Sequence, residues 1–377
     1  MELLGNLFDR LLAVPGYVLP FVVGLGLLVF IHELGHYLAA RWRGVHAEVF
    51  SIGFGRPLLR WTDRRGTEWR IAWIPLGGFV KMHGQETPEE APPEVRATWQ
   101  PGRTFHGKSV GSRAIVVAAG PIANFLLAIV LFAVLFTAYG RPVPDAGQAT
   151  VIARVAPDSA AAQAGLRRGD RILSIDGQPI TSFEEVQRRV QPRANERVDL
   201  LVERDGASIE VPAVPRAEPD GKGRLGVTGG GIRLERLDPA TALVAGIEQT
   251  AGITWHTLVG VGEMITGQRS AKELGGPIRI AEVSAEAAQM GLDTFINLLA
   301  VLSVSLGLLN LFPIPVLDGG HLMFYAAEAI RGRPLPPKVQ EYGFRAGFAL
   351  LIALFLFASR NDIVEGGIGR FVAGLLG

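Results

Sequence analysis

Four long apolar stretches separate polar segments along the chain. They cover residues 17–40, 114–139, 292–317 and, least clearly, 339–358. A helix of about 20 residues rises about 30 Å, which is the thickness of the hydrocarbon part of a bilayer. Arg345 interrupts the apolar pattern of the fourth span, so its long side chain must snorkel or face protein. The pattern predicts a polytopic α-helical membrane protein with about four transmembrane helices.

The charges between the spans predict their orientation. Segment 41–113 contains 12 Lys and Arg against 7 Asp and Glu, and segment 318–345 contains 4 against 3. Loops with such an excess lie preferentially on the cytoplasmic side, which leaves the N-terminus, the segment between spans two and three, and the C-terminus on the outer side. The first span follows no basic region and ends without a small-residue cleavage site, so we expect a retained anchor.

The cytoplasmic segment 41–113 contains a β pattern. Residues 50–59 and 69–75 alternate apolar and polar side chains on either side of a polar turn, which predicts two paired strands. The edge of such a pair is free to bind another extended chain. Packing of a hairpin on the protein surface is the alternative.

The outer segment contains a compact α+β domain at residues 148–230. Short strand and helix patterns alternate there, and Asp205-Gly206 is a hairpin signal between two strands. Residues 241–290 are semi-apolar and predict helices that lie on the outer membrane surface or pack inside the protein. His256 in this region is too isolated to be a metal ligand.

Composition agrees with a membrane protein that has some mass outside the bilayer. Hydrophobic residues make up 48% of the 377 residues and charged residues 19%. The formal net charge of +1, without a basic patch interleaved with aromatic residues, gives no sign of a nucleic-acid partner. The absence of cysteine excludes thiolate metal sites and disulfides, so His, Asp and Glu are the available metal ligands.

A metal-binding pattern lies near the end of the first span. His32 and His36 are four residues apart, so a helix places both imidazoles on one face. With Glu33 they form the pattern of zinc hydrolases, in which the glutamate is the general base beside the open coordination position. A pair of core histidines with a neighbouring carboxylate is the alternative, but these groups are costly to bury in lipid without a function.

A catalytic zinc site needs a third protein ligand, and Asp318 is the strongest candidate. It follows the third span directly, where Pro313 and Pro315 break the helix. A carboxylate there is costly without a partner, and broken backbone at membrane depth is tolerated only against protein or a polar cavity. His321 is the rival ligand, and a carboxylate that merely stops the helix is the remaining alternative. In the second span, Asn124 either lines a water-accessible cavity or bonds neighbouring helices.

Further motifs share one resemblance. The membrane motifs are H-E-L-G-H at residues 32–36, F-S-I-G-F-G-R-P-L at 50–58, I-P-L-G-G-F-V-K-M at 74–82, G-P-I-A-N-F at 120–125, G-G-P-I-R-I-A at 275–281 and N-L-F-P-I-P-V-L-D-G-G at 310–320. Residues 164–180 look like part of a bacterial PDZ domain, and Leu225-Gly226-Val227 resembles the ligand-pairing strand of its circularly permuted form. Together these motifs resemble the site-2 protease family of intramembrane zinc metalloproteases, in particular its bacterial regulator-of-sigma-E protease branch.

The resemblance implies a site and a location. It assigns Zn²⁺ to His32, His36 and Asp318, catalytic acid and base work to Glu33, and support of the active site to Asn310. It also implies a membrane-associated β region and an inserted periplasmic PDZ-like domain in a protein of the bacterial inner membrane. The active site would then lie near the cytoplasmic side.

The resemblance also implies substrates and partners. The expected reaction is regulated intramembrane proteolysis of a single-span membrane protein, such as an anti-sigma factor, or of signal-peptide remnants. A peptide or a C-terminus is the expected ligand of the PDZ-like domain. Some relatives carry tandem PDZ domains, whereas this chain has room for one, so its selection of substrates stays open. A catalytically silent scaffold that uses the PDZ-like domain and a soluble zinc protease are the alternative functions.

A substrate helix hides its amides in its own hydrogen bonds, so cleavage requires local unwinding to an extended strand. The strand predicted at residues 69–75 is the expected template with which the unwound substrate pairs. Proline at Ile71 or Ile74 would disturb this pairing.

Overall fold

A computed structural model of the chain describes residues 2–86, 91–145, 148–218, 221–229, 231–271 and 274–365. Four helical segments in this part of the chain are long and apolar enough to cross a membrane, in agreement with the four predicted spans. They are Leu19–Trp42, Val110–Ala138, Leu292–Leu311 and Pro337–Val364.

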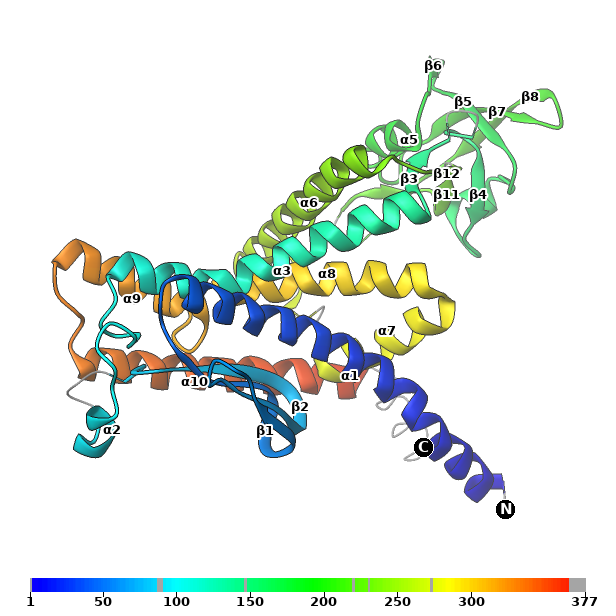
Figure 1. The fold of residues 1–377 in the computed structure, drawn as a ribbon. Helices are drawn as coiled ribbons and strands as arrows, with labels where there is room; N and C mark the ends of the chain where they lie inside the picture. The colour runs from blue at the N-terminus through cyan, green and yellow to red at the C-terminus, as the bar shows by residue number, and fades with distance from the viewer. Residues whose placement is uncertain are drawn as a thin grey trace. The chain divides into compact units, whose positions relative to one another are not determined.

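Long helices and one pair of long strands precede a stretch of short strands and short helices, and five helices, α6 to α10, follow it (Figure 1). The helices are α1 (Glu2–Trp42), α2 (Pro93–Ala97), α3 (Val110–Ala138), α4 (Ala160–Gln163), α5 (Phe183–Val190), α6 (Pro239–Ile265), α7 (Pro277–Met290), α8 (Leu292–Leu311), α9 (Asp318–Arg331) and α10 (Pro337–Glu365). The strands are β1 (Ala47–Thr62), β2 (Glu68–Met82), β3 (Arg141–Pro144), β4 (Ile152–Val155), β5 (Arg171–Ile175), β6 (Gln178–Pro179), β7 (Val198–Arg204), β8 (Ala207–Ala213), β9 (Arg216–Ala217), β10 (Gly223–Arg224), β11 (Val227–Gly229) and β12 (Ile232–Glu235).

The chain forms two compact units. The membrane unit combines Met1–Leu135 with Asp238–Gly377, and the inserted unit is Phe136–Leu237. An inserted domain that folds around its own core is expected where a long polar segment interrupts an apolar sequence.

In the membrane unit, α1 packs against α3, α7, α8 and β2. Gly35 lets α1 and α3 approach closely, because a Cβ there would lie 2.3 Å from the carbonyl oxygen of Ala119. Small residues at such contacts are typical of helix packing in membranes, where van der Waals contact replaces the hydrophobic effect. α6 packs with Gly246 against Ile129 of α3 and exposes Trp255 on another face.

The third predicted span, 292–317, is not one continuous helix. α8 ends at Leu311, because Pro313 and Pro315 cannot continue its hydrogen bonding, and α9 begins at Asp318. Within this break Val316 has a φ of 99°, a conformation that a β-branched residue adopts only under strain. The break therefore directs the chain so that Asp318 stands at the start of α9.

β1 and β2 form an antiparallel pair with an irregular register. Phe50 of β1 lies opposite Val80 and also opposite Trp69, so the first part of β1 has β2 residues on both sides. The expectation that 69–75 forms the free edge is therefore wrong, since Ile71 pairs with both Ile52 and Leu59. Among the described strands, no third one pairs with the end of β2, and that edge is free.

The inserted unit contains a four-stranded sheet in the order β6-β5-β7-β8. Its core consists of fully buried aliphatic residues such as Ile152, Ile172 and Leu200, against which α5 packs Val186. The predicted hairpin turn at Asp205-Gly206 joins β7 to β8, and both residues have positive φ, as a two-residue turn of this kind requires. A separate pair, β11 with β4, lies at the sequence that resembles a ligand-pairing strand.

Candidate metal centre and active site

Three predicted ligands meet although they lie far apart in the chain. His32 and His36 lie one turn apart on α1, and their Nε2 atoms are 3.2 Å from each other. Oδ2 of Asp318 lies 3.2 Å from Nε2 of His32 and 3.5 Å from Nε2 of His36. Their ligand atoms form one compact cluster. His321 is outside it, so the structure favours Asp318 over the rival ligand.

The separation of these atoms suits a tetrahedral zinc ion. Bonds of about 2.0–2.2 Å at tetrahedral angles place two ligand atoms about 3.3–3.6 Å apart. Oδ2 of Asp318 is buried, and among the described residues no N–H or O–H group donates to it. An unprotonated carboxylate oxygen and two imidazole nitrogens that converge on one point form a set of ligand atoms suited to a metal ion. His32, His36 and Asp318 therefore have the chemistry and the spacing to hold Zn²⁺.

Both imidazoles contact α3 through their other ring nitrogen. Nδ1 of His36 donates to the carbonyl oxygen of Val116 at 2.9 Å, which leaves Nε2 free as a ligand atom. Nδ1 of His32 lies 3.2 Å from Nδ2 of Asn124. Asn124 is fully buried, and its side chain contacts the candidate ligand His32. This contact differs from both interpretations of its sequence position, which were a cavity lining and a bond between neighbouring helices.

Glu33 is buried beside the ligands on α1 and faces β2. β2 approaches Glu33 through Gly78 and Val80, which line the same cavity as its carboxylate. Gly78 allows this approach, since a Cβ there would lie 3.0 Å from Cγ of Glu33 and 2.7 Å from the carbonyl oxygen of Ser51. The free edge of β2 is therefore adjacent to the residue predicted to be the general base.

The remaining candidates occupy the wall of the same cavity or lie elsewhere. Asn310 lines the cavity, and its Nδ2 donates to the carbonyl oxygen of Leu306 at 3.0 Å. The ring of His321 also lines the cavity and packs 5.3 Å from that of Phe344. Burial lowers the pKa of His321, which keeps its imidazole neutral near pH 7. His256 is exposed on α6, away from these residues.

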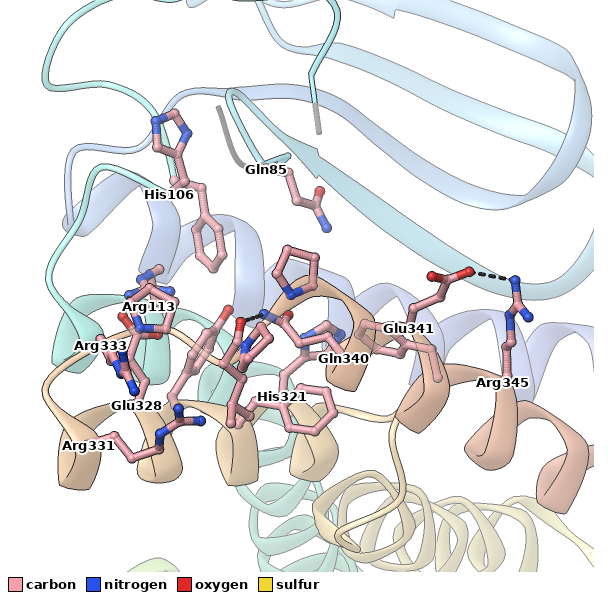
Figure 2. A pocket seen from close by; sticks show the side chains of 18 residues that line it. Gln85, His106, Arg113, His321, Glu328, Arg331, Arg333, Gln340, Glu341 and Arg345 are labelled. Carbon is pink, nitrogen blue, oxygen red and sulfur yellow. Dashed lines mark hydrogen bonds and ion pairs between the residues drawn. The ribbon is translucent and has the colours of Figure 1, made fainter. Parts of the chain in front are cut away.

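The metal cluster lies in a cavity of about 360 Å³ that adjoins a larger one of about 950 Å³. Both cavities are lined by Gln85, Phe105, His321 and Tyr325, so they share a wall or an opening. Figure 2 shows the larger cavity, with Gln85 and His106 on one side and residues of α9 and α10 on the other. Charged, aromatic and proline side chains line this space beside the metal cluster.

Charged side chains line the larger cavity. Arg113 pairs with Glu328 at 2.6 Å, and Arg345 pairs with Glu341 at 2.5 Å (Figure 2). Burial raises the pKa of Tyr325 to about 12, so its hydroxyl remains protonated at any physiological pH. Charged side chains and a neutral hydroxyl therefore line this cavity, and such a lining is compatible with water.

Sequence reasoning missed two residues that shape the site. A Cβ at Gly120 would lie 2.3 Å from Nε2 of His36 and 2.9 Å from Cε1 of His32, so only glycine leaves room for both rings. Val80 of β2 lines the same cavity as Glu33. The motifs G-P-I-A-N-F and I-P-L-G-G-F-V-K-M contain these residues, but their contacts with α1 are not visible in a single sequence.

Comparisons with known proteins identify the family of the chain. The model of peptidase family M50 matches residues 20–354. A protein of Rhizobium meliloti, named as an inferred zinc metalloprotease, is 49% identical over 92% of this chain and 96% of its own length. A metalloprotease of Caulobacter vibrioides, MmpA, is 39% identical over 93% of this chain and 96% of its own length.

Two solved PDZ domains are similar to part of the chain. That of an SdrC-like protein from Listeria innocua is 23% identical, with a TM-score of 0.20, over 22% of this chain and 92% of the domain. That of the Listeria monocytogenes protein is 21% identical, with a TM-score of 0.20, over 23% of this chain and 90% of the domain.

The family match covers most of the chain, and the relatives match over nearly their full length. The candidate zinc ligands His32, His36 and Asp318 all lie within the matched residues. The chain belongs to peptidase family M50, the site-2 protease family of zinc metalloproteases.

Proposed function

We propose that the chain is an intramembrane zinc metalloendopeptidase that cleaves the transmembrane segments of single-span proteins. The main support is that His32, Glu33 and His36 lie within a helix that is long and apolar enough to cross a membrane. A hydrolytic centre at that depth is suited to peptide bonds that are themselves in the membrane. Ionisable residues inside membrane spans are rare unless they have such a function.

The chemistry follows from the residues around the metal ligands. When bound, zinc supplies Lewis-acid polarisation of the scissile carbonyl and makes water easier to deprotonate. Glu33 accepts a proton from the attacking water and delivers it to the leaving nitrogen. Asn310, on the wall of the cavity, is placed to donate a hydrogen bond to the substrate. The neighbouring polar cavity supports a supply of water.

The proposed location is the bacterial inner membrane. The basic segment 41–113 and the segment after α8 would lie in the cytoplasm, by the distribution of Lys and Arg. His36 lies close to Arg41 at the end of α1, so the active site would be near the cytoplasmic side. The inserted unit would then be periplasmic.

The free edge of β2 is the proposed template for the substrate. An extended chain can add to this edge by backbone hydrogen bonds, and Glu33 lies directly beside it. The unwound part of a substrate helix would in this way be held next to the metal. This replaces residues 69–75 with Gly78–Val80 as the pairing segment.

The inserted unit is proposed to bind a peptide or a C-terminus. A cavity of about 580 Å³ lies between α5 and β11 and is lined by Arg154, Val186 and Val227, among others. β11 pairs with β4 and with no other described strand, so its second edge is open. Proposed substrates are anti-sigma factors already shortened on the outer side, and signal-peptide remnants.

The test is cleavage of candidate single-span proteins by the purified protein in lipid vesicles. Glu33→Gln should lower the cleavage rate by about 100-fold to 10,000-fold, because the general base is lost, and should retain zinc. Glu286→Gln, an exposed position on α7, is the matched control and should cleave normally. Full cleavage by Glu33→Gln would show that Glu33 is not the base. Zinc binding without any cleavage by the wild type would favour the scaffold instead.

A further inference from the structure

Asn124 is placed to control one of the two histidine ligands. Its side chain is fully buried in α3, and Nδ2 lies 3.2 Å from Nδ1 of His32. Its other side-chain atom, Oδ1, is buried and has no hydrogen-bond partner among the described residues. A buried amide oxygen without a partner costs about 1–3 kcal/mol, so its position needs an explanation.

The tautomer that zinc requires supplies that explanation. When Nε2 of a neutral imidazole binds a metal, the ring proton is on Nδ1, which then needs an acceptor. An amide nitrogen cannot accept a hydrogen bond, but an amide oxygen can. Rotation of the Asn124 amide by about 180° exchanges the two atoms and brings Oδ1 to the proton on His32. This rotation pairs the Nδ1 proton of His32 with Oδ1 and moves Nδ2 to the position that Oδ1 leaves.

We propose that Asn124 is a positioning residue: its Oδ1 accepts the hydrogen bond from Nδ1–H of His32 and so fixes the tautomer and ring orientation that present Nε2 to zinc. His36 has the equivalent contact from Nδ1 to the carbonyl oxygen of Val116. α3 therefore orients both histidine ligands, one through a side chain and one through the backbone.

The position of Asn124 is itself fixed by a second contact. Its main-chain carbonyl oxygen accepts a hydrogen bond from Oγ of Ser303 at 2.8 Å, and Ser303 is fully buried on α8. The backbone contact joins α3 to α8, whereas the side-chain contact serves the metal ligand. These two roles can be separated by mutation, because Ser303 does not touch His32.

The experiment measures zinc affinity of the full-length protein in detergent by competition with a chelator. Asn124→Leu keeps a similar volume but removes the acceptor, and should weaken zinc binding by about 10-fold to 100-fold. Asn124→Asp keeps an acceptor oxygen and should bind zinc within about 3-fold of the wild type, or more tightly, as carboxylate partners of zinc-bound histidines do. Ser303→Ala is the control for packing and should leave zinc affinity unchanged.

Two further measurements separate positioning from folding. The thermal unfolding midpoint of each zinc-depleted variant shows whether the helices still pack. The visible spectrum of the cobalt-substituted protein reports the ligand geometry, and only Asn124→Leu should change it. Equal losses of zinc affinity in the Leu and Asp variants, or no loss in Asn124→Leu, would overturn the proposal. A loss in Ser303→Ala as large as that in Asn124→Leu would also overturn it, because packing alone would then explain both.

Discussion

At the residue scale, the space around the two imidazoles is set by Gly120. Zinc binding requires both rings to converge on one point, and α3 passes directly behind them. Any side chain larger than hydrogen at this position would occupy the place of His36, because the added Cβ would be only 2.3 Å from its Nε2. The absence of a side chain at Gly120 is therefore expected to matter as much for metal binding as the presence of a ligand side chain.

Gly120→Ala should lower zinc affinity at least about 10-fold and cleavage with it, because the ring of His36 must move and ligand geometry tolerates displacements of only a few tenths of an ångström. Metal content after dialysis and chelator competition measure this. Gly111→Ala, in the same helix with no atom within 4 Å of the added Cβ, is the matched control and should bind zinc normally. Normal zinc binding by Gly120→Ala would contradict the packing described here.

At the scale of elements, the close approach of the end of β2 to α1 depends on Gly78. Gly78 has no side chain to separate the strand from Glu33, and Val29 of α1 lies on the same contact. The position of the strand relative to Glu33 therefore depends on Gly78, and a substitution there tests whether the strand is a template.

Gly78→Ala should reduce cleavage of an intact transmembrane substrate by about 10-fold to 100-fold, since small displacements of a substrate-positioning group have effects of this size. Zinc affinity should not change. A short extended peptide needs no unwinding and should lose less. Gly26→Ala is the control: Gly26 lies in α1 with open space around the added Cβ, so this variant should behave as the wild type. If both substrates lose activity equally, the strand acts through Glu33 alone and is not a template.

Elements also show how far the sequence could predict the structure. The four long apolar helices and the convergence of His32, His36 and Asp318 could be predicted, because apolar length, helical spacing and an isolated carboxylate each have one dominant physical interpretation. The contacts of Asp362 were not. This buried residue of α10 accepts hydrogen bonds from the backbone N–H groups of Gly276, at 2.7 Å, and Ile278, at 3.1 Å, at the start of α7. Such long-range caps depend on packing that no local pattern records, and the irregular register of β1 with β2 was hidden for the same reason.

At the scale of the whole molecule, the inserted unit has its own core and its own buried ion pair. Asp170 is only 1% exposed and accepts hydrogen bonds from Nε and Nη2 of Arg204, each at 2.7 Å. The backbone N–H of Arg167 also donates to it at 2.8 Å. Burial alone would raise the pKa of Asp170, but these hydrogen bonds outweigh it and hold the pKa below its ordinary value.

The stability of the inserted unit should therefore depend on pH in the acidic range. A carboxyl group whose pKa is lowered by folding contributes its full stabilisation above the pKa of the unfolded chain, about 3.9, and loses it as the pH falls through the folded value. Hydrogen exchange of peptides from β5 and β7, corrected for intrinsic rates, should show constant protection above about pH 5 and a decline below about pH 4. Asp170→Asn should be less protected at neutral pH and show a smaller decline. An identical decline in both proteins would assign the effect to other groups.

Peptide binding by the inserted unit should be separable from zinc chemistry in the membrane unit. The carbonyl oxygen of Gly226 accepts from the N–H of Ala156 at 2.8 Å, so alternation along the strand directs the N–H of Val227 to the open edge of β11. Val227→Pro removes this donor and should weaken binding of a C-terminal peptide at least about 10-fold, measured by fluorescence anisotropy, while zinc affinity stays the same. Thr228→Val alters the neighbouring side chain and leaves the backbone intact, so it should bind normally. Because Arg154 and Arg224 border the cavity, amidation of the peptide C-terminus should also weaken binding. Equal affinity of the Val227→Pro variant and the wild type would exclude strand addition at β11 and leave the inserted unit without a peptide ligand at that edge.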